Sequence, residues 1–374
     1  MNVLLIAGEK SGEEHALSFL PTILSLAPHV SFWGVGGDEL QKTGMELTYH
    51  LKDFSSWGIG EVIGKIPFYL KAEKNILREV ERRGTKTAIL IDFQDFNLRL
   101  AKKLKKRGVK VLYYVAPQAW AWKAWRAKVL SQTVHTLFTI IPFEKKWFLD
   151  RGVNQVRGVI HPLLHHYKND LKNLPDRTFS SMQKECHLLI LPGSRNFEVK
   201  NLLPIFLETA VLLKQEFNIK LSLVRTTSVK SEIYDYYAHY FDRVYNSEDL
   251  TQALKEADLC LAASGTVTLA SALFEVPTVV SYMGNLVTEF IFNNFISYKG
   301  PISLTNIVHE KILFPEILQY DVNAANLRRQ LLPWLTNVTS YEKIKAELKE
   351  TKNKISGEDF DLPRYLLNVI DGKN

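Results

Sequence analysis

The sequence predicts an α/β fold of two Rossmann-like, doubly wound parallel-sheet domains that face a central cleft. Short apolar runs alternate with amphipathic stretches over most of the chain, a pattern typical of βα repeats. The chain has 374 residues, which is more than one domain usually holds. A polar run, "KNDLKNLPDRTFSS" from Lys168, separates two series of apolar segments and indicates the edge of a linker.

Each series predicts its own sheet. The first has strands at "VLLIA" from Val3, "AILI" from Ala88, "KVLYYV" from Lys110 and "TLFTII" from Thr136, with helices over 13–26, 68–82 and 97–106. The second has strands at "HLLIL" from His187, "KLSLV" from Lys220, "LCLA" from Leu259 and "TVVSY" from Thr278. Beyond about residue 323 the sequence is helical and charged. We therefore expect domains at 1–165 and 166–338, and a helical segment at 339–374 with the option of packing back on the first domain. Ligands should lie at the carboxyl ends of the strands.

The composition is that of an ordinary globular protein, with 46% hydrophobic and 23% charged residues. A net charge of +7 favours an anionic partner: nucleic acid, a phosphorylated small molecule or an acidic membrane surface. Composition does not choose among the three. Cys186 and Cys260 stand in apolar runs, so neither a disulfide framework nor a zinc site is indicated, and a reduced cytoplasmic compartment fits best.

Membrane targeting is not indicated either. The start, "MNVLLIAGEKSGEEH", has too short an apolar core and no basic region for a signal peptide. The window most like a membrane span, 257–280, is interrupted by Asp258 and Glu275 and punctuated by Gly265 and Pro277. We interpret it as strand, turn, helix and strand in a soluble protein.

Two strand ends in the first half carry acidic residues. After the first strand come Glu9 and Ser11 in "AGEKSGEEH", whose glycine spacing matches neither a Walker loop nor a GxGxxG motif. A tight turn with Ser11 as helix cap is the favoured simple alternative. Asp92 follows the strand "AILI" directly, where burial would raise its pKa toward that of a general base. Asp95 is expected to cap the next helix.

A tryptophan-rich loop follows the next strand, in "YYVAPQAWAWKAWRAK". Its aromatic residues and the cations between them are Trp120, Trp122, Trp125, Lys123, Arg126 and Lys128. Such a set can stack on single-stranded nucleic acid, line a sugar or acyl pocket, or lie at a lipid interface. Its place after a buried strand favours a pocket. No known nucleic-acid-binding module is present, so we expect no nucleic-acid partner.

Two further turns favour anions in the second half. Both follow a predicted strand and open a predicted helix, so backbone N–H groups point outward. They consist of Gly193, Ser194 and Arg195 in "LPGSRN", and of Ser264, Gly265 and Thr266 in "AASGTVT". An arginine can add a bidentate contact to phosphate. The pair is more specific than either turn alone.

The order of motifs along the chain resembles lipid-A-disaccharide synthase, an inverting glycosyltransferase family of GT-B fold. The motifs are "AGEKSGEEH", "WGIGEVIGKIP", "IDFQDFN", "YYVAPQAWAWKAWR", "IIPFEKKWF", "HPL", "LPGSRNFEV", "AASGTVTLASAL", "PTVVSY", "SLTNIV" and "FPEILQ". The resemblance implies transfer of 2,3-diacylglucosamine from UDP to the 6-hydroxyl of 2,3-diacylglucosamine 1-phosphate, without a cofactor or metal. It also implies a cytoplasmic protein in peripheral contact with the anionic inner-membrane surface, and it leaves a homo-oligomer open.

The resemblance also assigns roles to matching residues. Asp92 would be the general base, with Glu9 and Ser11 placing the acceptor or the reacting sugar. The residues expected to bind UDP and the donor are Gly193, Ser194, Arg195, Ser264, Gly265, Thr266, Asn306, Glu316, Gln319 and His161. Those expected to contact acyl chains or the membrane are Trp120, Trp122, Trp125, Ile66 and Phe68.

Some positions depart from the family pattern. The departures are Glu13 for Asp, Phe93 and Gln94 for a small residue and Pro, Ile160 for Gly, Met283 for a basic residue, and Thr305 for Pro. Most notably, Ala270 stands where the family commonly has a Glu that contacts the ribose. Another UDP-sugar transferase or epimerase of this fold, or a divergent paralogue with an altered donor, therefore stays open. So does a non-enzymatic protein that binds nucleic acid or an anionic membrane, whose binding would collapse with salt.

Overall fold

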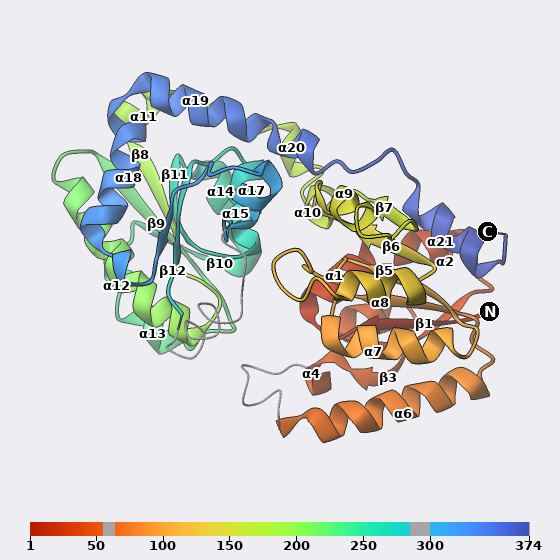
Figure 1. The fold of residues 1–374 in the computed structure, drawn as a ribbon. Helices are drawn as coiled ribbons and strands as arrows, with labels where there is room; N and C mark the ends of the chain where they lie inside the picture. Colours follow the sequence, from red (N-terminus) through yellow and green to blue (C-terminus); the bar gives the residue numbers. More distant parts are fainter. Residues whose placement is uncertain (55–63, 285–299, 374) are drawn as a thin grey trace. The chain divides into compact units, whose positions relative to one another are not determined.

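The computed structural model describes residues 1–54, 64–284 and 300–373, and the chain divides into two units (Figure 1). The first unit holds Met1–His166 and Ser356–Asn374, and the second holds Tyr167–Ile355. Each unit is a parallel sheet with helices on both faces, as a doubly wound fold requires. The sequence prediction of two parallel-sheet α/β units is confirmed.

The sheet of the first unit has seven strands in the order β3-β2-β1-β4-β5-β6-β7, and all their pairings are parallel. The strands are β1 Asn2–Ala7, β2 Ser31–Gly36, β3 Glu46–His50, β4 Thr87–Ile91, β5 Lys110–Tyr114, β6 Thr136–Thr139 and β7 Val156–Gly158. The helices are α1 Lys10–Leu17, α2 Leu20–Leu26, α3 Asp38–Lys42, α4 Leu51–Phe54, α6 Ile66–Arg82, α7 Gln94–Lys105, α8 Arg126–Thr133, α9 Glu144–Leu149, α10 Pro162–His166 and α21 Leu362–Ile370.

Alternation along β1 divides the core of this unit into two clusters. Leu4 and Ile6 pack in the cluster that contains buried residues of α6, α7 and α8. Val3 and Leu5 pack in the cluster that contains buried residues of α1, α2 and α21. Because successive side chains of a strand point to opposite faces, both faces of β1 are buried, which explains why its sequence is continuously apolar.

The predicted helix at 13–26 is wrong in one respect, because the structure has two helices there. α1 ends at Leu17 and α2 begins at Leu20. Pro21 lies in the first turn of α2. A proline has no N–H to donate to the preceding turn and clashes with its carbonyl group, so a continuous helix through this position is disfavoured.

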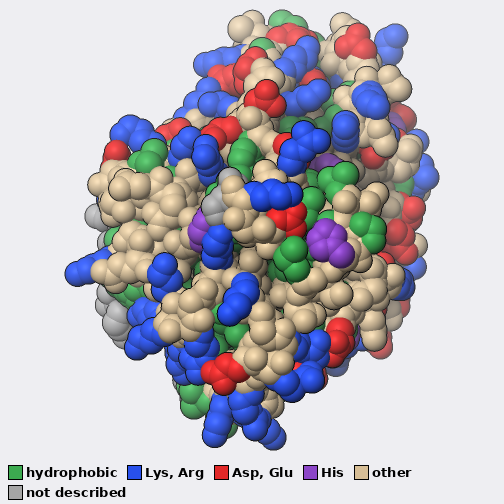
Figure 2. All heavy atoms as spheres, turned by 90° about the vertical axis from the view of Figure 1, so that its right-hand side faces the viewer, with side chains coloured by type: hydrophobic (Ala, Val, Ile, Leu, Met, Phe, Trp, Pro, Cys, Tyr) green, Lys and Arg blue, Asp and Glu red, His purple; other side chains and the backbone are tan. Residues whose placement is uncertain are grey.

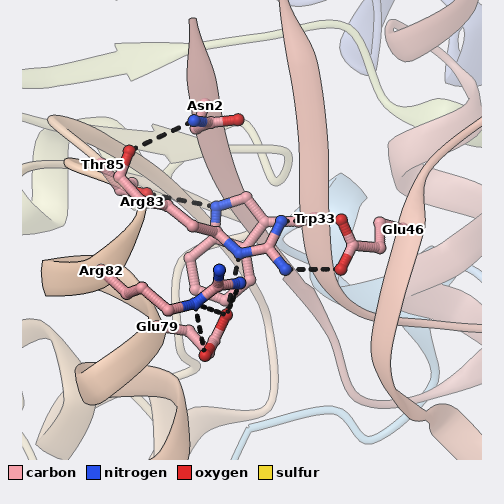
Figure 3. A network of polar contacts seen from close by, with 7 residues as sticks. All are labelled: Asn2, Trp33, Glu46, Glu79, Arg82, Arg83 and Thr85. Atoms are coloured by element: carbon pink, nitrogen blue, oxygen red, sulfur yellow. Dashed lines mark hydrogen bonds and ion pairs between the residues drawn. The ribbon is translucent and has the colours of Figure 1, made fainter.

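A polar network fixes the carboxyl end of α6 to the strands beside it (Figure 3). The guanidinium of Arg83 lies 4.8 Å from the centre of the Trp33 ring and pairs with Glu46 and Glu79. The indole N–H of Trp33 donates to the Thr85 hydroxyl at 3.1 Å. Trp33 belongs to β2 and Glu46 to β3, so the network holds α6 against the edge of the sheet.

The C-terminal segment of the chain packs on the edge strand β7. The carboxylate of Glu358 accepts the N–H of Gly158 at 3.1 Å and pairs with Lys145. Gly357 has a φ of +70°, and a Cβ there would lie 2.4 Å from the backbone N of Ile160. Only glycine allows this close approach without strain. The segment leads into α21, whose apolar face joins the core of the first unit.

The sheet of the second unit has six parallel strands in the order β10-β9-β8-β11-β12-β13. The strands are β8 Cys186–Leu191, β9 Ile219–Arg225, β10 Arg243–Asn246, β11 Leu259–Ala263, β12 Thr278–Tyr282 and β13 Glu316–Leu318. The helices are α11 Phe179–Lys184, α12 Asn196–Lys214, α13 Ser231–Asp235, α14 Leu250–Glu256, α15 Thr266–Leu273, α17 Leu304–His309, α18 Ala324–Thr336, α19 Val338–Lys349 and α20 Thr351–Lys354. Short 3₁₀ turns lie at Asp170–Lys172, Ala238–Tyr240, Ser247–Asp249 and Gln319–Asp321.

The window 257–280 forms a strand, a turn, a helix and a strand in this sheet, namely β11, α15 and β12. Buried Arg177 ties the helices around it together. It donates to the carbonyl oxygens of Phe274 at 2.9 Å and Leu254 at 2.6 Å, near the ends of α15 and α14. In the part of the chain that the structure describes, no helix combines the length and the apolar character needed to cross a membrane.

Candidate active site

The turn after β4 carries Asp92 in an unusual backbone conformation. Asp92 and Phe93 both have a φ of +44°, in the left-handed region that L residues rarely occupy. The N–H of Asp92 donates to the carbonyl of Tyr114 at 2.9 Å. Its own carbonyl accepts the Asn97 amide at 2.8 Å and the Tyr113 hydroxyl at 2.9 Å. Strained turns persist where neighbours over-determine them, and such turns cluster at functional sites.

The turn after β1 fits closely against Phe93. A Cβ on Gly8 would lie 2.8 Å from Cγ of the Phe93 ring and 2.9 Å from Cδ1. The Phe93 ring therefore covers the backbone of the turn after β1. A ring fits at position 93, where the family commonly has a small residue, because residue 8 is glycine. The two turns belong to neighbouring strands of the sheet, β1 and β4.

The charges around Asp92 suit it for proton transfer. Burial is the main cause that raises the pKa of this half-buried carboxyl, and the negative charge of Glu9 adds to it, so that the pKa lies at about 6. The N–H of Phe93 and the charge of Arg126 act in the opposite direction. A carboxyl with a pKa near 6 is ionised at neutral pH and is a stronger base than an ordinary aspartate.

Glu9 and Ser11 are both exposed at the start of α1. Glu9 occupies the N-cap position with an extended backbone, and no side chain caps the helix. The alternative in which Ser11 caps the helix is wrong, because α1 already begins at Lys10. Glu13 is buried and accepts the N–H of Leu40 at 3.0 Å, so it stabilises the first turn of α3.

The prediction that Asp95 caps α7 is wrong. The helix begins at Gln94, one residue before Asp95, and Phe93 holds the N-cap position. Its carboxylate instead lies 2.5 Å from the guanidinium of Arg126, which is fully buried and also contacts Gln94. Arg126 lies 5.2 Å from the centre of the Trp122 ring. This arginine thus joins the end of the tryptophan-rich loop to the first turn of α7.

The three tryptophans of the loop differ in environment. Trp120 donates its indole N–H to the buried carboxyl group of Glu144 at 2.9 Å. Trp122 lies under two cations, Arg126 and Lys123, the latter at 4.1 Å. Trp125 is 57% exposed. Only Trp125 therefore presents a large apolar surface to solvent.

The start of α6 shows the same division. Ile66 and Leu70 are 46% and 49% exposed. Phe68 instead packs edge-on against Tyr49 and Phe54 in an aromatic cluster, so it is mainly a core residue. The part of the motif "WGIGEVIGKIP" up to residue 63 lies outside the described residues.

His161 lies in the first unit, before α10, and is 3% exposed. Its Nδ1 accepts the N–H of Leu163 at 3.2 Å, and burial lowers its pKa to about 3. It is therefore neutral at physiological pH. No group of three His, Cys, Asp or Glu side chains that could hold a metal ion occurs within the described ranges.

In the second unit, the turn after β8 already contains a carboxylate. Glu198 accepts the N–H of Ser194 at 3.1 Å and pairs with Arg195 at 2.6 Å. A Cβ on Gly193, whose φ is +115°, would lie 2.6 Å from the same carboxylate. An anion at the start of α12 would therefore have to share these donors with Glu198. The Arg195 side chain remains 64% exposed.

The turn after β11 is open by comparison. Gly265 and Thr266 are exposed, and a Cβ on Gly265 would meet nothing within 4 Å. Ser264 is fixed through its N–H to the carbonyl of Ser281 at 2.9 Å. The described residues supply no hydrogen-bond partner for the N–H groups of Thr266 and Val267. These are the donors that an anion at a helix start uses.

Asn306 and Glu316 form a network below the segment at 302–303. Asn306 is fully buried, and its amide bonds to Leu313, Phe314 and Glu316 at 2.8 Å. Glu316 accepts the N–H groups of Ile302 and Ser303. Asn306 therefore supports the loop, whereas half-buried Glu316 reaches the surface.

Gln319 has a φ of +52° and accepts the N–H of Gly284 at 3.0 Å. Ala270 is 2% exposed within α15, so its methyl group is covered by protein. Glu275, beyond the end of this helix, pairs with buried Lys345 at 3.1 Å. Glu275 is therefore engaged in a structural ion pair.

Sequence reasoning missed four residues that shape these sites: Asn97, Arg126 in its buried role, Glu144 and Glu198. Asn97 and Glu198 lie five and six residues after the strand-end positions Asp92 and Pro192, so their proximity was a detectable signal. The partners of Arg126 and Glu144 lie 31 and 24 residues away, and nothing local in the sequence indicates them.

Comparison with known proteins agrees with this architecture. The model of the family "Lipid-A-disaccharide synthetase" matches residues 3–369. Lipid-A-disaccharide synthase 1 of Legionella pneumophila (strain Paris) is 30% identical over 99% of this chain and 97% of its own length. The synthase of Nitrosococcus oceani is 30% identical over 100% of this chain and 97% of its own length.

Solved structures show the same fold at low identity. A UDP-N-acetylglucosamine 2-epimerase from Listeria monocytogenes, described as putative, has a TM-score of 0.61 at 11% identity, with 100% of this chain and 96% of the other covered. MurG of Acinetobacter baumannii has a TM-score of 0.56 at 13% identity, with 99% of each chain covered. Both likenesses concern the fold alone. The two parallel sheets are those of the GT-B fold, and with the full-length relatives they show that the chain belongs to the lipid-A-disaccharide synthase family of glycosyltransferases.

Proposed function

We propose that this glycosyltransferase moves 2,3-diacylglucosamine from UDP to the 6-hydroxyl of 2,3-diacylglucosamine 1-phosphate, with Asp92 as general base. The observation that carries the proposal is the environment of Asp92. Its carboxyl has a pKa near 6, it is partly exposed, and it lies on a strained turn at the carboxyl end of β4. Ligands of open parallel sheets bind at such strand ends.

The reaction needs one base and one stabilised leaving group. Asp92 accepts the proton of the acceptor hydroxyl while that oxygen forms a bond to C1 of the donor sugar. The bond between C1 and the phosphate oxygen breaks, and UDP leaves with the electron pair. Attack opposite to the leaving group inverts the configuration at C1. A positioned base of this kind contributes about 10²- to 10⁴-fold in rate.

The start of α15 suits the phosphates of UDP. The N–H groups of Thr266 and Val267 are available there, and exposed Gly265 allows a ligand to approach the backbone. A helix start stabilises an anion by about 0.3–1 kcal/mol when exposed and up to about 2 when partly buried. Arg195 adds a positive side chain if its ion pair with Glu198 breaks when UDP binds.

Acylated substrates are held at a lipid surface, and α6 offers a suitable face. Exposed Ile66 and Leu70 lie beside exposed Lys71 and Lys74. Figure 2 shows the side on which α6 ends, and Lys and Arg side chains gather there along the lower edge of the view. Apolar side chains flanked by lysines are typical of contact with an anionic membrane surface.

The test is direct. Purified protein is incubated with UDP-2,3-diacylglucosamine and 2,3-diacylglucosamine 1-phosphate, and the lipid product is identified by mass spectrometry. We expect the disaccharide 1-phosphate from the wild-type protein and a loss of about 10²-fold or more in Asp92→Ala. Near-wild-type product formation by that variant would remove Asp92 as the base, and absence of product from the wild type would remove the proposed substrates.

A second function is favoured by one observation. Ala270 is buried where the family commonly has a glutamate, so the ribose must be held differently or the donor differs. The Listeria protein that is described as a putative UDP-N-acetylglucosamine 2-epimerase has the same fold. Binding of UDP measured against a series of UDP-sugars with and without acyl chains separates the two. Tightest binding to a non-acylated UDP-sugar would favour an epimerase or another transferase.

A further inference from the structure

Glu144 is a buried acid with an unusual partner. It begins α9 and is 1% exposed. One carboxyl oxygen accepts the indole N–H of Trp120 at 2.9 Å, and the other lies 3.4 Å from the N–H of Ile141. The ring of Phe143 packs edge-on against Trp120 with centroids 5.1 Å apart. Trp120 is thus held by α9, although it belongs to the loop after β5.

The opposite end of this loop is held by a buried cation. Arg126 is fully buried and bonds to Gln94 and Asp95 of α7, two and three residues beyond Asp92. The loop between β5 and α8 is therefore fastened at Trp120 to α9 and at Arg126 to the turn of Asp92. A loop fixed at both ends keeps one conformation, which a site needs if it is to orient a substrate.

We propose that Glu144 is a positioning residue that anchors Trp120 and thereby fixes the tryptophan-rich loop beside Asp92. Glu144 acts through Trp120 and does not touch the substrate. The proposal rests on the proposed function only where it concerns catalysis. The contact between Glu144 and Trp120 lies within this chain, so its effect on the loop can be measured without substrate.

The charges predict how the anchor responds to pH. The pKa of Glu144 lies at about 8: burial is the main cause that raises it and the negative charge of Asp92 also raises it, whereas the N–H groups of Trp120, Ile141 and Ile140 lower it. Asp92, with a pKa near 6, loses its proton at lower pH than Glu144. Near neutral pH, Glu144 is therefore protonated while Asp92 is charged. Such interacting groups titrate as a pair.

The test of the anchor uses the full-length protein with ¹⁵N-labelled tryptophan. The indole signal of Trp120 is assigned by its loss in Trp120→Phe. We expect its proton to exchange with solvent about tenfold or more slowly than that of exposed Trp125, and Glu144→Ala to remove this protection. Glu144→Gln keeps an acceptor oxygen, so the Trp120 indole proton of this variant should exchange as slowly as in the wild type. Trp147→Phe, a change on the same helix at a side chain that packs on Phe148, is the matched control and should leave the Trp120 signal unchanged.

A titration adds a second readout. The wild-type Trp120 signal should shift with a midpoint near pH 8, the shift should vanish in Glu144→Gln, and Asp92→Asn should lower the midpoint by removing a negative charge. In the transferase assay, Glu144→Ala and Trp120→Phe should each lower kcat/KM by about tenfold or more, and the double variant should lose no more than either single variant.

Unchanged protection of Trp120 in Glu144→Ala, or equal effects of Gln and Ala at position 144, would overturn the anchor. Fully additive losses in the double variant would overturn its link to catalysis. If the wild type makes no disaccharide, the proposed function fails, while the exchange and titration measurements still decide the anchor.

Discussion

Replacing Asp92 by asparagine should make the protein more stable and less active at the same time. A pKa raised from 3.8 to about 6 means that the folded protein disfavours the ionised carboxylate. The raised pKa therefore costs no stability at low pH, and the cost grows as the pH rises from about 4 to above 6. Two pKa units correspond to about 3 kcal/mol, which asparagine would recover at pH 7.5.

The structure indicates that asparagine fits this turn. The hydrogen bonds to Tyr113, Tyr114 and Asn97 involve the backbone of residue 92 and do not change. Asparagine also tolerates the left-handed conformation at a φ of +44°. The variant therefore removes the charge and little else.

The assay is urea unfolding of wild type and Asp92→Asn at two pH values, with hydrogen exchange to follow the first unit. We expect the variant to be more stable by about 3 kcal/mol at pH 7.5 and by about half of that at pH 5, where wild-type Asp92 is mostly protonated. Asp150→Asn is the control, since that carboxylate also lies in the first unit, is 54% exposed and pairs with exposed Lys146. If the two proteins have the same free energy of unfolding, or if the difference between them does not change with pH, the assigned environment of Asp92 is refuted.

Three further outcomes follow from the same geometry. In a pH–rate profile, transferase kcat/KM should fall about tenfold between pH 7 and pH 5 as Asp92 is protonated. Glu9→Gln should shift this fall in kcat/KM to lower pH, because it removes a negative charge that raises the pKa of Asp92. Gly8→Ala should lower activity through contact of its methyl group with the Phe93 ring, and a second change of Phe93→Ala should relieve it. Gly357→Ala should lower the free energy of unfolding of the first unit by about 1–3 kcal/mol in denaturant melts, since its backbone is left-handed and meets Ile160.

The sequence predicts the central strands of both sheets well and the edges poorly. β1, β4, β5, β8, β11 and β12 are buried on both faces and read as continuous apolar runs. The edge strands β3, β7, β10 and β13 are short and partly exposed, so their patterns do not stand out. β2 is central but was also missed, because Gly34 and Gly36 dilute its apolar run.

The same distinction applies to the site. A carboxylate directly after a buried strand is a local pattern, and it led to Asp92. The groups that set its environment come from other elements: Glu9 from the turn after β1, and Arg126 from the start of α8. Their approach depends on the order of strands in the sheet, which places β1 and β5 on either side of β4.

The order of strands also explains why the charges of the first unit gather around one position. β4 is flanked by β1 and β5, so the turns after these three strands end at the same edge of the sheet. Each turn brings a different element: the first an exposed acid, the second the strained Asp92, the third the loop that leads to buried Arg126. The negative charge of Glu9 then raises the pKa of Asp92, and the positive charge of Arg126 lowers it. Burial is the largest cause of the raised pKa, and the two charges modify it, so removing Glu9 should lower the pKa and removing Arg126 should raise it.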